Sequence, residues 1–304
     1  NALIQPTTTH SLSFNGTDQN VEIDEFPESE ANSHTISLWF KAEEWNGGDL
    51  ISKDGEASQR QWLIGSASAD GRIRSHVWTT ETSYYKDSNQ YLSLNEWHHV
   101  VQKWDGTSLS FYINGELVVS APWTTSASWG SGGGDSGIQV GTVGSEGSYA
   151  DIDIMQAAFF EGSSAYHSAA DVKAMYDLGP TGNLNTSYST GMVANYGFGN
   201  LDAVNALSTS AATADTVSTV YDRKASGTAK NLTQSTSGSQ PTISTYYYPS
   251  NSAKRLAHGP LLYTTDPTGN TAILKCSEYA IRTTREIESY WKQAFNNIDS
   301  PIDF

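Results

Sequence analysis

The sequence predicts an all-β fold, an antiparallel jelly-roll sandwich of two sheets. Residues 11 to about 160 form short runs in which apolar and polar residues alternate, separated by Gly, Asn and Asp. Within 97–120, Asp105-Gly106 and Asn114-Gly115 each separate two such runs, and both dipeptides favour hairpin turns. Only 37% of the residues are hydrophobic and 16% charged, which is typical of β-rich proteins with many loops.

Two segments show the strand pattern most clearly. The segment "HTISLWFKA" (34–42) places Ile36, Leu38 and Phe40 on one face of an extended chain. The segment 97–120 alternates in the same way on both sides of its second turn. We therefore expect these segments to form antiparallel strands with one buried face.

A short helix is predicted to close this part of the chain at 168–179. Ser168 is a candidate N-cap, and Gly179-Pro180 provides a stop signal. Apolar residues stand at helical spacing between these ends, namely Val172, Met175 and Tyr176.

The composition and the hydrophobic periodicity of the sequence change after the helix, so we predict a sandwich domain at 1–180 and a C-terminal extension at 181–304. The extension is rich in Ser, Thr and Ala with thin periodicity, and 233–242 resembles a linker. Its end is predicted to be a helix, because Thr283 and Glu286 fit a capping box. An apolar stripe follows the box, formed by Ile287, Tyr290, Trp291 and Phe295. We expect an otherwise irregular extension that is ordered by packing on a neighbour.

Composition excludes several classes of protein. The chain has 17 basic and 33 acidic residues, a net charge of −16, so a nucleic-acid-binding surface is not expected. Cys276 is the single cysteine, which rules out an intrachain disulfide. No apolar run reaches the roughly 18 residues of a membrane span, and the first residues do not read as a signal peptide.

Four quoted stretches resemble laminin G-like domains of the concanavalin A-like superfamily. "HSLSFNGTDQNVEI" is similar to the opening strand of such domains, and "HTISLWFKA" to the next. "EWHHVVQKWDGTSLSFYINGELV" resembles their central hairpins, and "SYADIDIMQAAFFEGSSAYHSAADVKAMYDLG" their closing strand and helix. The matches fall in order over about 11–179. The resemblance implies a two-sheet antiparallel jelly roll.

The extension resembles segments that follow laminin G-like domains in structural proteins of marine phages and bacteria. Tyr196, Asp222 and Asn231-Leu232 stand at the characteristic positions of that pattern. This looser resemblance implies a component of a virion or cell surface.

A catalytic role is not expected, although "NVEIDEFPES" (20–29) begins like a glycosidase strand. Glu22 and Asp24 share one face of an extended strand. The second catalytic carboxylate should then stand at position 26 or 27, where the chain has Phe26 and Pro27. A retaining glycosidase needs its two carboxyl groups about 5–5.5 Å apart. The family match makes this an outer strand, and we predict that its acidic face is solvated and that the protein is not an enzyme.

Two further motifs have structural interpretations. His98 and His99 are neighbours on a strand and point to opposite faces, so they cannot chelate one ion together. The family resemblance implies a structural calcium ion held near Gly16, Asp18 and Asp153, and hard oxygen ligands suit calcium. Without calcium, Asp18 and Asp153 would be hydrogen-bonding residues of a turn and a strand end.

Carbohydrate binding requires aromatic platforms beside polar groups. The chain has nine Trp and 16 Tyr, more than a core of this size needs. The candidates in or beside polar loops are Trp78, Tyr84, Tyr85, Trp123, Trp129 and Tyr149. Core packing and subunit contacts are the alternative roles for these side chains.

The leading functional hypothesis is a non-enzymatic structural or interaction protein, a phage virion component that displays a lectin-like domain. Capsid decoration, a fibre and a tail-associated protein are the forms considered. The alternatives are a secreted carbohydrate-binding lectin or adhesin and, third, a glycoside hydrolase on the same fold. The expected partners are further copies of the chain or other virion proteins, and cell-surface glycans. The expected location is the virion surface or the extracellular space.

Overall fold

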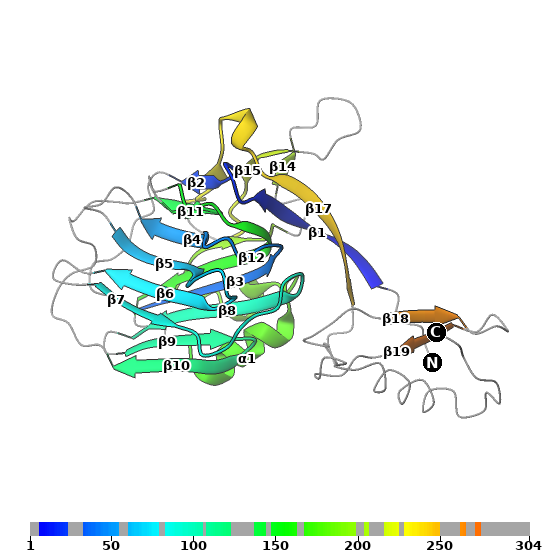
Figure 1. Cartoon of the computed structure of the whole chain (residues 1–304). Helices are drawn as coiled ribbons and strands as arrows, with labels where there is room; N and C mark the ends of the chain where they lie inside the picture. Colours follow the sequence, from blue (N-terminus) through cyan, green and yellow to red (C-terminus); the bar gives the residue numbers. More distant parts are fainter. Residues whose placement is uncertain are drawn as a thin grey trace. The chain divides into compact units, whose positions relative to one another are not determined.

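The computed structural model describes residues 6–23, 33–54, 60–78, 83–105, 108–122, 137–143, 147–162, 167–198, 204–206, 216–224, 228–249, 262–265 and 271–274. Their regular secondary structure is mainly strands, and two antiparallel sheets pack face to face as a jelly-roll sandwich (Figure 1). The fold class predicted from the sequence is therefore confirmed.

The first sheet has eight described strands. Seven follow one another in the order β10-β9-β8-β3-β12-β1-β17, and β13 also pairs with β12. The bounds are β1 Pro6–Asn15, β3 His34–Ala42, β8 Trp97–Trp104, β9 Ser108–Ile113, β10 Glu116–Pro122, β12 Asp151–Glu161, β13 Met192–Tyr196 and β17 Thr242–Pro249.

The second sheet has nine described strands in the order β14-β15-β16-β2-β11-β4-β5-β6-β7. Their bounds are β2 Val21–Ile23, β4 Asp49–Asp54, β5 Arg60–Ser66, β6 Ile73–Trp78, β7 Ser83–Asp87, β11 Ile138–Val140, β14 Val204–Ala206, β15 Val217–Val220 and β16 Leu232–Thr233. A separate hairpin is formed by β18 Leu262–Thr265 and β19 Thr271–Leu274. It belongs to a second unit made of Asn1–Gln5 and Pro249–Phe304.

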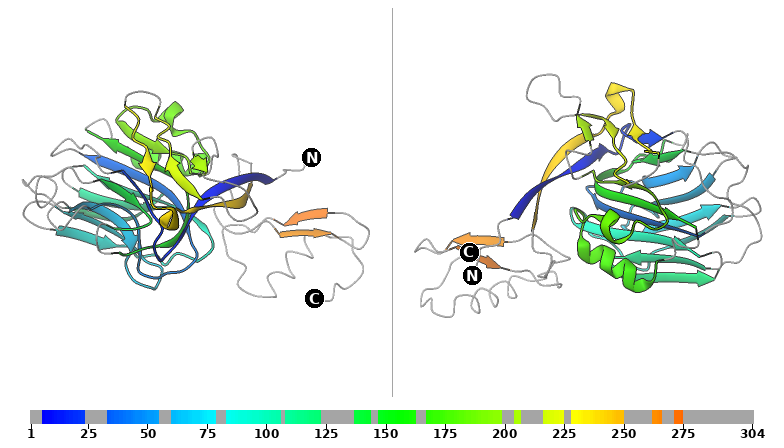
Figure 2. Two further views of the ribbon diagram at one scale, coloured as in Figure 1. Left: turned by 90° about the horizontal axis from the view of Figure 1, so that it is seen from above. Right: turned by 180° about the vertical axis from the view of Figure 1, so that it is seen from behind.

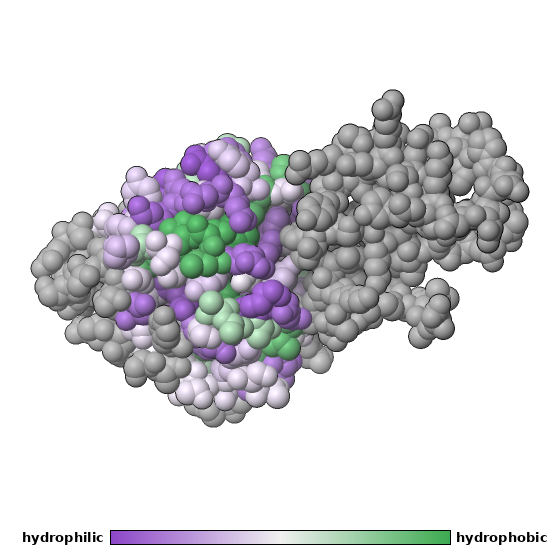
Figure 3. All heavy atoms as spheres, turned by 90° about the horizontal axis from the view of Figure 1, so that it is seen from below, coloured by the Kyte–Doolittle hydropathy of each residue, from purple (hydrophilic) through white to green (hydrophobic). Residues whose placement is uncertain are grey.

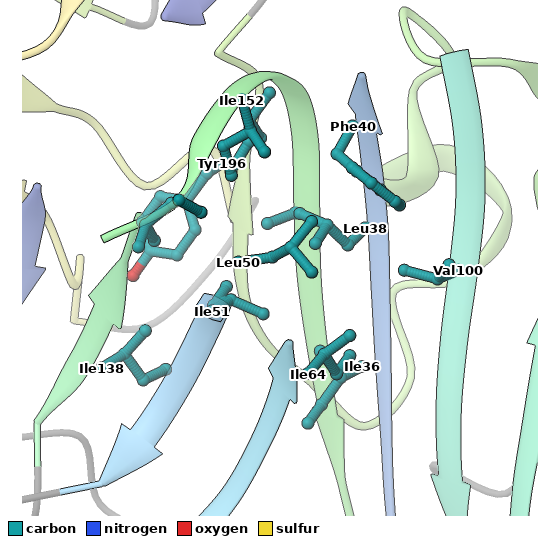
Figure 4. Packing of buried hydrophobic residues seen from close by; sticks show 14 of the residues in the cluster. Ile36, Leu38, Phe40, Leu50, Ile51, Ile64, Val100, Ile138, Ile152 and Tyr196 are labelled. Carbon is teal, nitrogen blue, oxygen red and sulfur yellow. The ribbon is translucent and has the colours of Figure 1, made fainter. Parts of the chain in front are cut away.

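The hydrophobic core lies between the two large sheets. Ile36, Leu38 and Phe40 alternate with outward residues on β3, and all three are at most 2% exposed. Figure 4 shows them facing side chains of the second sheet, among them Leu50, Ile51 and Ile64. The prediction that Ile36, Leu38 and Phe40 form the buried face of strand 34–42 is therefore confirmed.

One helix, α1 Ala169–Leu178, covers the outer face of the first sheet (Figure 2). It begins with a capping box, in which Ser168 and Asp171 each accept a hydrogen bond from the other's backbone N–H. Its apolar side packs on the sheet, since Val172 contacts the cluster of Val101 and Tyr112. The predicted closing helix is confirmed, and a short α2 Leu184–Ser187 and a 3-10 turn Ser237–Ser239 follow it.

The edge strand β10 is irregular. Leu117 is 52% exposed, and the pairing of β10 with β9 shifts register between Leu117 and Val119. Such a bulge twists an edge strand and discourages its pairing with another chain.

On the face of the molecule drawn in Figure 3, an apolar patch is surrounded by polar residues.

The structure differs from the expected organisation after the helix. The sequence predicts a boundary at residue 180, whereas the unit that contains the sandwich extends over Pro6–Tyr248. β13 and β17 join the first sheet, and β14, β15 and β16 extend the second. These strands are ordered by pairing with β2, β12 and β1. Most have only two to five residues, which is too short for a recognisable alternation.

The same pairing corrects the expected position of the strand that carries Glu22. β2 is an inner strand, with β11 on one side and β16 on the other. The predicted helix at 283–295 and Cys276 lie outside the described residues. Of the described helices, none is both long and apolar enough to cross a membrane.

Candidate functional site

Five side chains gather on the outer face of the second sheet, at its β6–β7 edge. Residues of β6 alternate between buried and half-buried, with Ile73, Ser75 and Val77 directed into the sandwich. The outward residues Arg74 and His76 lie opposite Asp87 and Tyr85 of β7 in the strand register. We name Arg74, His76, Trp78, Tyr85 and Asp87 the β6–β7 cluster.

The aromatic part of the β6–β7 cluster is continuous. The rings of His76 and Trp78 are stacked, with centroids 3.6 Å apart and planes inclined by 27°. The ring of Tyr85 meets His76 edge-on at 5.4 Å. Tyr85 is 50% exposed, so this aromatic surface is open to solvent.

The polar part of the cluster is an ion pair beside the Tyr85 ring. Arg74 donates two hydrogen bonds to Asp87, from Nε to Oδ1 at 2.7 Å and from Nη2 to Oδ2 at 3.2 Å. These bonds raise the pKa of the Arg74 guanidinium above its usual value, and they hold it 4.3 Å from the Tyr85 ring centroid. The hydrogen bonds to Asp87 therefore keep the Arg74 guanidinium protonated and hold it beside the Tyr85 ring.

Asp49 lies near the same ion pair because β5 has a glycine between the two strands. Gly65 pairs with Asp49 on β4 and with Arg74 on β6. A Cβ atom at Gly65 would lie 1.8 Å from Oδ1 of Asp49, so no larger residue fits while that carboxylate keeps its place. The charge of Asp49 also contributes to the raised pKa of Arg74.

The arrangement suits a ligand with one apolar face and several hydroxyl groups. Aromatic rings pack against C–H surfaces, while an arginine–aspartate pair offers donors and acceptors together. On the adjacent strand β5, Gln61 and Leu63 are only 7% and 8% exposed. The open surface is therefore formed by β6 and β7.

The structure separates the aromatic residues that the sequence groups together. Trp78 and Tyr85 lie in the cluster, whereas Tyr84 is on the opposite face of β7 and packs against the core. Tyr149 is not part of the cluster, but it pairs with the nearby Asp49 in an isolated parallel bridge. Trp123 and Trp129 lie outside the described residues.

Three cluster members were not predicted. Arg74 and His76 precede Trp78 at intervals of two, and Asp87 follows Tyr85 at the same interval. Side chains at this spacing share a strand face, which is the signal that could have found them.

The candidate catalytic strand has no carboxylate partner for Glu22 among its described neighbours. In the ladder Glu22 lies between Gln139 and Thr233. Gln139 donates a hydrogen bond from Nε2 to Oε2 of Glu22 at 3.1 Å. Asp24, Phe26, Pro27 and Glu28 lie outside the described residues.

The two adjacent histidines have separate structural roles, as the sequence predicts. The His98 ring lies 3.1 Å from the carbonyl oxygen of Ser93. His99 Nε2 lies 2.8 Å from Oγ of Ser37, and its ring stacks on Trp39 at 5.0 Å. Their different partners agree with side chains on opposite faces of β8.

Asp153, one of the three residues expected at a calcium ion, has a protein cation as its partner. It is 1% exposed on β12, and Lys41 Nζ on β3 lies 2.8 Å from its Oδ2. Burial raises the pKa of Asp153, and the hydrogen bond and charge of Lys41 oppose that rise. The buried carboxylate is thus balanced by Lys41.

The other two residues have partners of their own. Asp18 Oδ1 accepts a hydrogen bond from Asn15 Nδ2 at 2.9 Å, and the carbonyl oxygen of Gly16 accepts one from Asn46 at 3.4 Å. No group of three or more His, Cys, Asp or Glu side chains in the described part of the chain is placed to hold a metal ion. The calcium ion expected near Gly16, Asp18 and Asp153 therefore stays a prediction.

Comparison with known families identifies the sandwich. Residues 15–163 match the profile of the concanavalin A-like lectin/glucanases superfamily. This part of the chain therefore resembles the domains of that superfamily. The resemblance seen in the sequence at 11–179 is confirmed for these residues. No curated protein matches the chain.

Several solved structures are similar to parts of this chain. A proposed carbohydrate-binding protein from Bacteroides ovatus is 12% identical with a TM-score of 0.51, over 80% of this chain and 60% of the other. A heptameric pentraxin from Limulus polyphemus is 14% identical with a TM-score of 0.43, over 58% and 84%. Domain 4 of a Geobacillus stearothermophilus arabinanase, solved with arabinotriose, is 16% identical with a TM-score of 0.41, over 55% and 76%. The chain spans 60% of the Bacteroides protein, and likeness at such identity shows the fold alone.

Proposed function

We propose that the concanavalin A-like domain is a non-enzymatic, carbohydrate-binding module whose site is the β6–β7 cluster. One observation carries the proposal: an aromatic surface of Trp78, His76 and the half-exposed Tyr85 adjoins a hydrogen-bonded arginine–aspartate pair. A sugar ring offers the complementary features, since C–H groups line one face and hydroxyl groups its rim. The fold shared with a proposed carbohydrate-binding protein agrees with this function.

A binding role is favoured over hydrolysis because both carboxylates at this place, Asp87 of the cluster and the adjacent Asp49, interact with Arg74. The two-carboxylate mechanism of glycosidases needs one group as acid and another as nucleophile or base. Calcium is not part of the proposal, because Lys41 supplies the positive charge beside Asp153.

The first prediction concerns the aromatic surface. We expect the full chain to bind a subset of glycans on an array, and Trp78→Ala or Tyr85→Ala to weaken that binding at least tenfold, because each removes a stacking surface. Tyr91→Ala is the matched control, since Tyr91 is 68% exposed and outside the cluster. Binding that survives both cluster substitutions would place the site elsewhere, and glycan cleavage by the purified protein would contradict a non-enzymatic role.

We further propose that the chain displays this domain within a larger assembly, as a virion component at a capsid, fibre or tail. The support is the resemblance of the extension to segments of phage structural proteins, carried by Tyr196, Asp222 and Asn231-Leu232. Asp222 forms an antiparallel β-bridge with Tyr196, and its backbone N–H donates a hydrogen bond to Oδ1 of Asn231 at 3.0 Å. The residues of this pattern are therefore neighbours in the fold.

The second prediction tests assembly directly. We expect light scattering of the full chain to give a mass of more than one copy, and a chain ending at Tyr248 to give a smaller assembly or a monomer. The measurement is the molar mass across a range of concentrations. A full chain that stays monomeric throughout would contradict self-assembly and favour a secreted lectin or adhesin.

A further inference from the structure

The charges of the β6–β7 cluster restrict the kind of glycan that it can take. Arg74 is the cation of the cluster, and Asp87 occupies two of its donors. Asp49 adds a second negative charge close to the same guanidinium. Arg72 also interacts electrostatically with Asp87 and is itself paired with Asp70. Two positive groups, Arg72 and Arg74, thus face three negative ones, Asp49, Asp70 and Asp87, so this end of the site is negatively charged, on a chain whose net charge is −16.

An anionic sugar would meet repulsion at this position. Its carboxylate or sulfate could reach Arg74 only beside Asp87 and Asp49, and like charges at such short range repel. It would also compete with Asp87 for the guanidinium, leaving a partly buried carboxylate without its partner, because Asp87 is 25% exposed.

A neutral sugar avoids both costs. A hydroxyl group donates and accepts, so one of two neighbouring hydroxyls can accept from Arg74 while the other donates to Asp87. The ion pair stays intact, and the ring can lie against Tyr85, which adjoins the guanidinium at 4.3 Å.

We infer that the β6–β7 cluster binds neutral glycans through a pair of neighbouring hydroxyl groups at Arg74 and Asp87, and excludes glycans that carry a carboxylate or sulfate. This inference rests on the proposed carbohydrate-binding function. It adds the ligand class and assigns to Asp87 the role of excluding anions.

The test is an array of neutral glycans and their sialylated, uronic-acid and sulfated counterparts, probed with the full chain. We expect neutral glycans to bind at least tenfold more tightly than their anionic counterparts. Asp87→Asn removes the negative charge but keeps an oxygen acceptor, and should reduce that preference to about threefold or less. Asp177→Asn is the matched control, because Asp177 forms an ion pair with Lys173 on α1, away from the cluster. The control should leave the preference unchanged.

The outcomes separate this inference from the function on which it rests. Tighter binding of sialylated or sulfated glycans, lost in Trp78→Ala, would overturn the ligand class and leave the binding site standing. An unchanged preference in Asp87→Asn would overturn the role of Asp87. Absence of binding to every glycan would overturn the proposed function itself.

Discussion

Asp222→Ala is expected to lower the free energy of unfolding of the sandwich by about 3 kcal/mol. The Asp222 carboxylate accepts three backbone hydrogen bonds, from Asn195 at 3.0 Å, Lys224 at 2.9 Å and Lys230 at 3.1 Å. Removing it leaves three donors without their acceptor, and each partly buried donor costs on the order of 1 kcal/mol or more. These three hydrogen bonds lie where the segment after α1 joins the sheets.

Urea denaturation of the full chain, followed by tryptophan fluorescence, measures this effect. Asp222→Asn keeps one side-chain oxygen as acceptor, so we expect a loss of roughly 1 kcal/mol. Asp177→Ala removes an exposed carboxylate from an i,i+4 pair with Lys173 and should cost under about 0.5 kcal/mol. If Asp222→Ala were no worse than Asp177→Ala, the hydrogen-bond network around Asp222 would not support the fold.

The strands of the sandwich could be predicted wherever one face is buried and the run is long. β3 and the hairpins of β8, β9 and β10 satisfy both conditions, because Leu109, Phe111 and Ile113 point into the core at intervals of two. The turn Asn114-Gly115 marks the hairpin independently, since both residues adopt positive φ. The helix was equally clear from its caps.

The strands after the helix could not be predicted, because their order comes from pairing with strands far away in the sequence. Thr233 pairs with Glu22, more than 200 residues earlier. Gln234 Nε2 also donates to Asn20 Oδ1 at 2.5 Å. A two-residue strand such as β16 has no period of its own. Only the resemblance pattern of Tyr196, Asp222 and Asn231 indicated that this segment is structured.

The candidate site was predicted in part for a similar reason. Aromatic residues beside polar loops indicated Trp78 and Tyr85, but Tyr84 was included although neighbouring strand residues point to opposite faces. Arg74 and Asp87 are 13 residues apart and meet through the register of β6 and β7. Spacing along each strand could have shown that Arg74 shares a face with Trp78 and Asp87 with Tyr85. The contact between Arg74 and Asp87 depends on the register of the folded sheet and could not be predicted from spacing.

Acid is expected to destabilise the fold well before most carboxylates titrate, because two histidines are buried in neutral form. Burial lowers the pKa of His99 from 6.5 to about 3, and burial together with the charge of Lys53 lowers that of His34 to about 3. A lowered pKa in the folded state means that the unfolded chain binds more protons between pH 6.5 and pH 3. The stability from these groups is therefore present above pH 6.5 and is lost as the pH falls towards 3.

At pH 5 each histidine should cost about 2 kcal/mol relative to pH 7, or roughly 4 kcal/mol for the pair. Urea denaturation at both pH values measures the loss. His99→Phe keeps an aromatic ring beside Trp39 and Tyr176, where His99 now stacks, and removes one proton-binding group. Its loss between pH 7 and pH 5 should therefore be about half that of the natural sequence. An equal loss in both proteins, or an NMR titration of His99 near pH 6.5 in the folded chain, would show that this imidazole is not held neutral by the packing of α1.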